Sequence, residues 1–310
     1  MANISILGPM NIDLIAHGAA PEKKDALLEW VGTSNVSVLA AGAIGYFAGI
    51  ARALGHDVSV ITTLGDDPLG SMIMDCLARL KSDLSLVEIQ HGKTTAIAIY
   101  MLLFGSKKRP LTYQMPTHDL WPLKFTGKQQ DAVRKSGWFH HGGYLHFPAA
   151  WNGSVLELFT LARENGIGTS LDPQFPLTDY PVPWVHAVEP LLPLVDILFV
   201  DKHEACSLMG TADHVAAARA LLAKGPSMVI VKLGEDGSVL VDETGVLSQP
   251  AEKVPPAEIV DSIGAGDSFD AGFVDAYIAR QSKRDCLLRA TRVAASTLSQ
   301  SGGQLGRRSA

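Results

Sequence analysis

The sequence is poor in the features that mark secreted and nucleic-acid-binding proteins. Among 310 residues it has three cysteines, Cys76, Cys206 and Cys286. The number is odd and each lies in an expected helix, so we expect buried, reduced thiols rather than a disulfide framework. Basic residues are not in excess either. The 26 Lys and Arg stand against 32 Asp and Glu, a formal net charge of −6, which argues against nucleic-acid or anionic-membrane partners.

Long apolar runs are also absent. No segment is long and apolar enough to span a bilayer, and Met1 leads into a strand-like run without the features of a signal peptide. We therefore expect a cytoplasmic protein with no membrane partner. Two nucleotide-binding motifs are missing as well. Gly92-Lys93-Thr94 lacks the earlier glycine of a P-loop. No G-x-G-x-x-G follows the first expected strand, which argues against a dinucleotide-dependent dehydrogenase.

Strand-like and helix-like patterns alternate along most of the chain. Short apolar runs predict strands at residues 4–7, 58–62, 137–140, 169–171, 197–200 and 228–232. Helical periodicity predicts helices at 44–54, 69–80, 154–165, 185–194, 215–223, 266–281 and 284–301. This alternation predicts a single α/β domain over residues 1–310, with a mostly parallel central sheet and helices on both faces.

Two segments interrupt the alternation. Residues 13–39 show no core helix, and two β-like runs within residues 93–114 flank a hairpin signal at 105–110. We expect a small separate sheet built from roughly residues 12–40 and 93–116. Its apolar residues point to both faces, so a free-standing sheet of this kind should find a partner. These residues are Ile97, Ile99, Tyr100, Leu102 and Leu103.

The most informative segment is DSIGAGDSFDAGF at residues 261–273, which follows a strand-like run at 257–260. Gly264, Ala265 and Gly266 form a turn that only small residues allow, and the helical spacing after it places the turn at a helix N-terminus. Backbone amides and the helix dipole there favour a phosphate or an oxyanion. Asp267 in the first turn can take a proton from an attacking hydroxyl. A simple N-capped helix is the competing interpretation.

Other polar residues lie near expected strand ends. Asn11 and Asp13 follow the first strand in a loop, where α/β proteins place ligand groups, although a structural turn is the competing interpretation. His140, His141 and His146 surround a glycine pair in the segment 138–147. We favour core or substrate-facing histidines there over a metal cluster.

Residues 261–273 resemble the C-terminal signature of the PfkB/ribokinase family of small-molecule kinases, approximately D-T-x-G-A-G-D-x-F-x-x-G-F, with Ser262 in place of Thr. Other segments resemble family motifs in the family's order, with some departures. They are G-x-x-N-x-D at 8–13, the first signature at 41–48 with Tyr46 in place of Asn, G-D-D-x-x-G at 65–70, D-x-N at 172–174 with Gln174 in place of Asn, and N-x-x-E at 201–204 with Asp201 in place of Asn. The resemblance covers nearly the whole chain.

The resemblance implies a fold and a reaction. The fold is a ribokinase-like three-layer sandwich with a β-sheet lid, which in some members is also a dimer contact, so we expect a homodimer through the lid. The reaction is ATP-dependent phosphorylation of a hydroxymethyl group on a small sugar or sugar derivative. A nucleoside kinase is the alternative, because Tyr46, Phe47, Tyr113 and Tyr144 offer rings that stack on a base. A non-catalytic sensor is disfavoured by the intact Asp267.

The resemblance also implies roles for individual residues at the substrate and phosphate sites. Asp267 is the general base, and the amides of Gly264, Ala265 and Gly266 hold the transferring phosphate. Asn11 and Asp13 bind substrate hydroxyls. Their expected neighbours are Gly42, which allows a close approach, and Tyr46, which replaces the substrate-binding Asn of the family.

A second group of roles concerns the nucleotide and the metal ions. The turn with Lys232, Gly234 and Gly237 is similar to the family's nucleotide-side turn, although a tight β-turn is the alternative. Asp201 and Glu204 support Mg²⁺ through water, or alternatively form a helix cap. Asp261 and Ile263, with the glycine segment 301–306, are implied to supply backbone oxygens to a monovalent cation such as K⁺.

Overall fold

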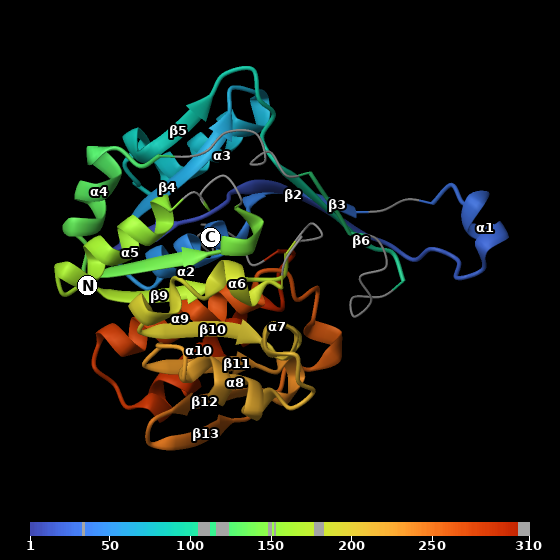
Figure 1. Cartoon of the computed structure of the whole chain (residues 1–310). Coiled ribbons are helices and arrows are strands. Elements are labelled where there is room, and N and C mark those ends of the chain that lie inside the picture. The colour runs from blue at the N-terminus through green and yellow to red at the C-terminus, as the bar shows by residue number, and fades with distance from the viewer. Residues whose placement is uncertain are drawn as a thin grey trace.

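A nine-stranded sheet and a separate four-stranded sheet form the framework of the molecule. The computed structural model describes residues 1–32, 35–104, 112–115, 124–147, 151, 153–176 and 183–302. Figure 1 shows helices on both faces of the large sheet and the small sheet projecting to one side. This arrangement confirms the predicted α/β sandwich with a mostly parallel sheet and a small β lid.

The large sheet is parallel except at one edge, and its order is β13-β12-β11-β10-β9-β8-β1-β4-β5. The strands are β1 (Asn3–Leu7), β4 (Asp57–Gly65), β5 (Val87–Gln90), β8 (Trp138–Gly142), β9 (Gly168–Asp172), β10 (Ile197–Asp201), β11 (Met228–Lys232), β12 (Ser238–Asp242) and β13 (Gly245–Gln249). Only the β11–β12 and β12–β13 pairs are antiparallel. The carboxyl ends of seven neighbouring strands, from β11 to β5, therefore share one edge.

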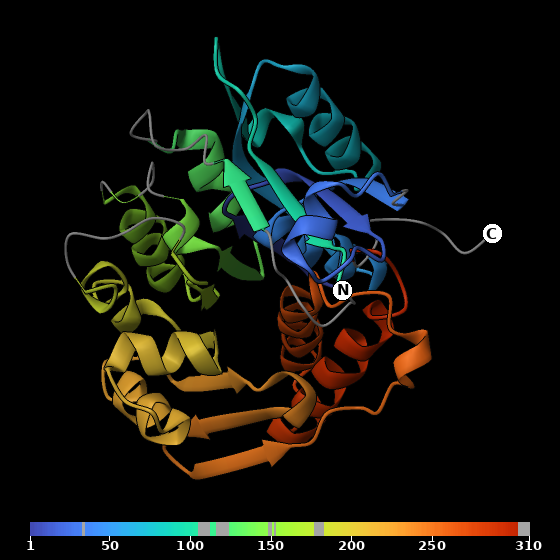
Figure 2. The same ribbon diagram turned by 90° about the vertical axis from the view of Figure 1, so that its right-hand side faces the viewer.

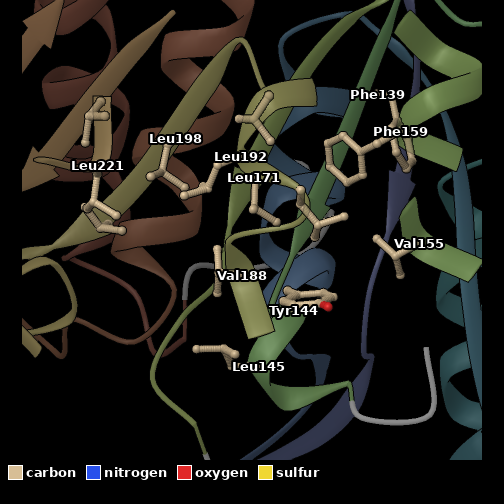
Figure 3. Close-up of a cluster of buried hydrophobic side chains, with 14 of the residues drawn as sticks. Phe139, Tyr144, Leu145, Val155, Phe159, Leu171, Val188, Leu192, Leu198 and Leu221 are labelled. Atoms are coloured by element: carbon tan, nitrogen blue, oxygen red, sulfur yellow. The ribbon is translucent and has the colours of Figure 1, made fainter. Parts of the chain in front are cut away.

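Alternate side chains of the central strands pack into two cores, one on each face. In β10, Leu198 and Val200 belong to one core and Ile197 and Phe199 to the other. The first core, part of which is drawn in Figure 3, lies under α4 (Gly127–Arg134), α5 (Ser154–Glu164), α6 (Val185–Val188), α7 (Lys202–Met209) and α8 (His214–Leu222). The second lies under α2 (Ala43–Ala53), α3 (Pro68–Arg79), α9 (Ala265–Ile278) and α10 (Lys283–Thr297). Continuous apolar strands are what a sheet covered on both faces requires.

The small sheet, which we call the lid, has the order β3-β2-β6-β7. Its strands are β2 (Asn11–His17), β3 (Asn35–Ala41), β6 (Ile97–Leu102) and β7 (Thr112–Met115), and a short helix α1 (Lys24–Leu28) joins β2 to β3. In Figure 2 the lid strands stand in front of the large sheet. They come from the two predicted segments, and α1 buries none of its residues, so the absence of a core helix there is also confirmed.

Several predicted elements differ from the structure. Residues 256–258 form a short 3-10 helix, not a strand, because two prolines precede Ala257 and restrict the backbone. The helix predicted at 185–194 is two short pieces, α6 and a 3-10 turn at Leu192–Leu194, separated before Pro193. Strands β5, β12 and β13 and helix α4 were not predicted from the sequence. The hairpin signal at 105–110 lies outside the described residues.

The structure also bears on the predictions about the cysteines and about membrane-spanning segments. All three cysteines are free; Cys76 and Cys286 are buried, but Cys206 is half-exposed, so burial is wrong for that residue. Among the residues the structure describes, no helix has the length and apolar character needed to cross a membrane.

Candidate active site

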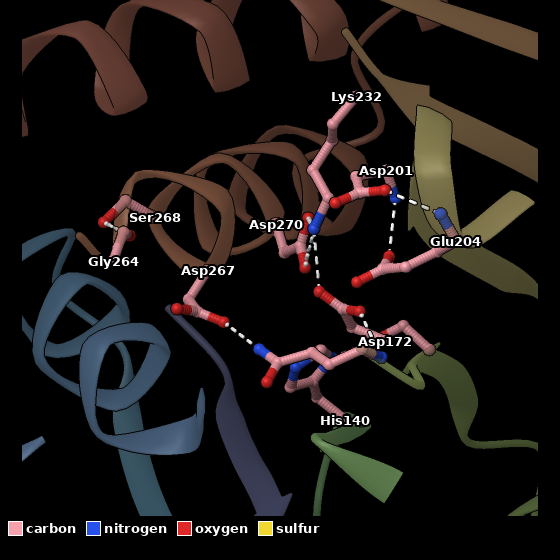
Figure 4. Close-up of polar contacts among 11 residues, drawn as sticks. His140, Asp172, Asp201, Glu204, Lys232, Gly264, Asp267, Ser268 and Asp270 are labelled. Atoms are coloured by element: carbon pink, nitrogen blue, oxygen red, sulfur yellow. Dashed lines mark hydrogen bonds and ion pairs between the residues drawn. The ribbon is translucent and has the colours of Figure 1, made fainter. Parts of the chain in front are cut away.

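Charged residues gather where parallel strands end. Asp172, Asp201 and Lys232 are the last residues of β9, β10 and β11, three neighbours in the sheet. Figure 4 shows these side chains converging with Glu204 from α7 and Asp267 from α9. Ligand sites of open α/β sheets lie at this edge, because loops and helix N-termini meet there.

The N-terminus of α9 forms one wall of this site. Gly264 is its N-cap, with φ 77°, in the left-handed region that glycine adopts without strain. A Cβ on Gly264 would lie 2.6 Å from the ring of Tyr46, so no larger residue fits. The predicted glycine turn at a helix start is confirmed. As at any helix start, the first-turn amides lack intrahelical acceptors and face an anion favourably.

A buried ion-pair cluster ties α9 to the sheet. Lys232 Nζ lies 2.7 Å from Asp172 Oδ2 and 3.2 Å from each carboxylate oxygen of Asp270. The Asp172 and Asp270 side chains are 2% and 1% exposed, so the contacts are protected from solvent. Burial opposes the charged form of Lys232, but the carboxylates around it raise its pKa well above the ordinary value. Lys232 is therefore a fixed cation at the base of the site.

Asp267 is held in an environment that raises its pKa. It lies in the first turn of α9, and Oδ1 accepts a hydrogen bond of 2.8 Å from Gln174 Nε2. Burial raises the pKa of Asp267 well above the ordinary value, and the negative charge of Asp172 raises it further, while Lys232 acts in the opposite direction. A carboxylate with a raised pKa is a stronger base, as general-base chemistry requires.

Asp201 and Glu204 form a reciprocal cap at the start of α7. Asp201 Oδ1 accepts from Glu204 N at 2.7 Å, and Glu204 Oε2 accepts from Asp201 N at 2.6 Å. The capping alternative is thus confirmed. Burial, together with the charges of Asp172 and Asp201, raises the pKa of Glu204 well above the ordinary value. Lys232 acts in the opposite direction.

These oxygen donors are chemically suited to Mg²⁺. Carboxylates are the protein ligands this hard cation prefers, and it commonly keeps several waters beside one or two carboxylates. Within the described part of the chain, no group of three or more His, Cys, Asp or Glu side chains is arranged to hold a metal alone. The donor set therefore fits an ion held jointly by protein, water and phosphate oxygens.

The predicted substrate residues meet at the junction of lid and sheet. Asn11 and Asp13 lie in β2 and not in a loop, because the chain enters the lid at Asn11 and pairs at once with Ala41. Asn11 Nδ2 and Tyr46 Oη donate to the two carboxylate oxygens of Asp13. Gly42 caps α2 with φ 88°, and a Cβ there would lie 2.6 Å from Asn11 Oδ1.

Asp261 accepts hydrogen bonds from donors around it. Its carboxylate receives Ile263 N at 3.0 Å and Gly302 N at 3.2 Å, and His17 Nε2 lies 3.2 Å from Oδ2. These contacts show that the Asp261 carboxylate fixes the loop. The monovalent cation stays a prediction, and residues 303–306 of its expected loop lie outside the described residues.

The expected nucleotide turn joins β11 to the antiparallel β12. Gly234 and Gly237 begin and follow a short 3-10 turn there, so the β-turn alternative holds. Lys232 points away from this turn into the acidic cluster. Its Nζ would lie 3.5 Å from a Cβ on Gly266, which places the ammonium beside the first turn of α9.

Two histidines of segment 138–147, His140 and His141, are packed in the protein interior, whereas His146 is partly exposed. His140 stacks on Phe47 at 3.9 Å and its Nδ1 lies 2.9 Å from Ser170 Oγ. Burial lowers the pKa of His140 to about 3 and that of His141 to about 4. Both rings are therefore neutral at physiological pH, as expected for core histidines.

The comparisons with known proteins agree with this geometry. The pattern of the pfkB family carbohydrate kinases matches residues 1–309. The chain belongs to this family. Fructoselysine 6-kinase of Shigella flexneri is 28% identical over 251 residues, covering 78% of this chain and 83% of that protein. Family membership makes the chain a carbohydrate kinase, a phosphotransferase, as predicted.

Solved structures give the same fold. The ribokinase of Arabidopsis thaliana complexed with ribose and ATP superposes with a TM-score of 0.78 at 23% identity, covering 97% of this chain and 94% of that one. A putative ribokinase II from E. coli in complex with ATP and Mg²⁺ also has a TM-score of 0.78, at 19% identity, covering 98% and 94%. The predicted ribokinase-like fold is confirmed.

Three residues of this kinase site were missing from the predicted roles. Asp172 and Gln174 were noticed as a motif but given no function, although Asp172 follows the same strand-end rule as Asp201. Asp270 lies three residues after Asp267, on the same side of α9. An acidic residue amid apolar neighbours of a buried helix was the available signal, because such a charge needs a partner.

Proposed function

We propose that this kinase transfers the γ-phosphoryl group of ATP to a hydroxymethyl group of a small sugar or sugar derivative. The observation that carries the proposal is the position of Asp267. Asp267 lies in the first turn of α9, directly after the Gly264 turn. Tyr46 packs against Gly264 and donates its hydroxyl to Asp13. The base is thus close to the predicted substrate hydroxyl site and to the predicted phosphate site together.

The chain's own groups divide the reaction between them. Asp13 and Asn11 bind acceptor hydroxyls, and Asp267 takes the proton of the attacking one. The amides of Gly264, Ala265 and Gly266 receive the transferred phosphate. They stabilise the negative charge that spreads over its oxygens, since fixed dipoles cost no reorganisation during the reaction.

Asp201 and Glu204 are the residues that would hold Mg²⁺, through water, on the nucleotide side. When bound, this ion neutralises the charge of the phosphates. Support comes from the two carboxylates, which the reciprocal cap holds together at the start of α7. Lys232 contributes the other positive charge, beside Gly266. The turn at Gly234 and Gly237 remains our candidate for the nucleotide contact.

Aromatic packing favours a sugar over a nucleoside acceptor. The ring of Phe47 is fully buried and stacked on His140. Tyr144 is 6% exposed, and the ring of Tyr46 packs against Gly264 with its hydroxyl on Asp13. These rings already have partners within the protein, and the side chain of Tyr113 lies outside the described residues. The three described rings of the expected stacking surface are therefore not free to receive a base.

We also propose that two copies pair through the outer face of the lid. The register places Leu14 between Val38 and Ile99, and Ala16 opposite Val36, all on one face. The inner face carries Asp13, so the apolar outer face points away from the site. Val36 and Val38 are 58% and 47% exposed. Exposed apolar patches of this kind usually mark interaction sites.

The proposed function is tested by following ATP consumption with a panel of acceptors: ribose, fructose, a ketogluconate, fructoselysine and adenosine. We expect a sugar or sugar derivative to be phosphorylated at a hydroxymethyl group, identified by phosphorus NMR of the product. Turnover of adenosine with none of the sugars would support the nucleoside alternative. No ATP consumption with any acceptor would contradict the proposal.

A further inference from the structure

Gln174 has an unusual backbone conformation at the edge of the site. It follows the end of β9 with φ 56°. A straight-chain residue with positive φ is uncommon, whereas Asn and Gly enter this region more easily. Strain of this kind collects at functional sites, where the surroundings fix it. Asn is also the residue of the family pattern at this position. The chain therefore carries Gln, the amide residue that adopts a positive φ less easily.

The surroundings hold this turn from several sides. Gln174 N donates to Asp172 Oδ1 at 3.1 Å. One residue on, the carbonyl of Phe175 hydrogen-bonds to the ring of His146. The ring of Phe175 stacks on His203 at 4.7 Å and meets Trp184 edge-on at 4.3 Å. These contacts fix the backbone from which the Gln174 side chain departs.

The Gln174 side chain ends on the proposed base. Its Nε2 donates to Asp267 Oδ1 at 2.8 Å. The backbone of the same residue is bound to Asp172, which Lys232 holds at 2.7 Å, and Lys232 also binds Asp270 of α9. A closed chain of contacts therefore runs from Asp267 through the sheet edge and back to its own helix.

We infer that Gln174 is a positioning residue for the base in the proposed kinase reaction. By holding Oδ1 of Asp267, its amide fixes the rotation of the carboxylate and leaves Oδ2 to face the acceptor hydroxyl. A carboxylate turned away from the hydroxyl loses reactivity steeply, because proton transfer needs hydrogen-bond geometry. The inference rests on the proposed function and adds a residue to it.

The contact between Gln174 and Asp267 also affects the pH at which Asp267 ionises. A donor on the charged carboxylate favours ionisation, so its loss raises the pKa of Asp267 further. The charged and titratable groups that face Asp267 are Asp172 from β9, Lys232 from β11, Asp13 from β2, Tyr46 from α2 and Asp270 from α9. Gln174→Asn alters none of these groups, so a shift in the pH profile can be assigned to the lost amide contact.

Two variants test the inference. In Gln174→Asn the side chain is one methylene shorter, so the amide falls short by about 1.5 Å, while Asn suits the positive φ. We expect an unchanged or higher melting temperature, a kcat lower by about tenfold or more and an unchanged KM for the sugar. The acidic limb of the pH–rate profile should move to higher pH. Gln174→Glu keeps the length but replaces the donor with a like charge, so kcat should fall further.

Lys81→Asn is the matched control. Lys81 is exposed, is remote from the site and has φ 59°, so it reports what Asn does at positive φ without touching Asp267. We expect wild-type kcat and pH profile for this variant. If Gln174→Asn also keeps both while the wild type is active, the inference is wrong and the proposed function stands. A wild type inactive with every acceptor refutes the proposed function and this role with it.

Discussion

At the scale of single residues, Tyr46 is the departure from the family pattern with the clearest consequence. Its hydroxyl donates to Asp13 and its ring packs against Gly264, so one side chain touches both the proposed substrate site and the proposed phosphate site. Burial, and then the charge of Asp13, raise the pKa of Tyr46 well above the ordinary value. The phenol therefore remains a neutral donor and fills space that a smaller Asn would leave open.

We expect Tyr46→Asn to shift selectivity toward plain sugars, because the ring limits the volume beside Asp13. Tyr46→Phe keeps that volume and removes only the hydroxyl, so the ranking of acceptors should stay as in wild type. The measurement is kcat/KM for ribose, fructose and a ketogluconate, with an expected change of about tenfold or more for Tyr46→Asn. An unaltered ranking in Tyr46→Asn would show that the residue only packs.

At the scale of elements, the sequence pattern predicted the helices and strands whose own residues favour them. The buried parallel strands and the capped helices α3, α8 and α10 follow apolar runs and N-cap residues, and all were predicted. The antiparallel strands β12 and β13 were not. Gly245–Gln249 of β13 is largely exposed and shows no apolar run, whereas the short apolar run of the buried β12, at residues 239–241, was overlooked. Their pairing depends on an edge already formed by β11.

The lid is the element for which an oligomeric prediction can be made. Val38→Lys places a charge on the outer face, where Leu14 lies beside it and Ile99 lies on the strand beyond Leu14. If two lids pair, the buried charge is costly, so we expect the variant to be monomeric by light scattering at a concentration where wild type is dimeric.

Val246→Lys, at a residue that is 43% exposed on β13, is the control. It introduces the same charge on a comparably exposed valine away from the lid, and it should leave the mass unchanged. A monomeric wild type, or a Val38→Lys variant with the wild-type mass, would contradict pairing through the lid.

At the scale of the whole molecule, the site exists only because distant segments meet. Asp13, Asp172, Lys232 and Asp267 lie far apart in the chain and converge at one edge of the sheet. The sequence predicted Asp13, Lys232 and Asp267 by motif. It did not predict that Lys232 points inward to Asp172 and Asp270, or that Gln174 reaches Asp267, because those contacts depend on the register of three strands and one helix.

We propose that Asp267 is the general base of this carbohydrate kinase. Asp267→Asn is close to isosteric and its Oδ1 can still accept from Gln174, so fold and ligand binding should persist. The direct measurement is kcat for the best acceptor, beside the rise in melting temperature that the sugar and ATP cause. We expect kcat to fall by about 10²–10⁴-fold with the ligand-induced rise retained. A kcat near that of the wild type would contradict the account.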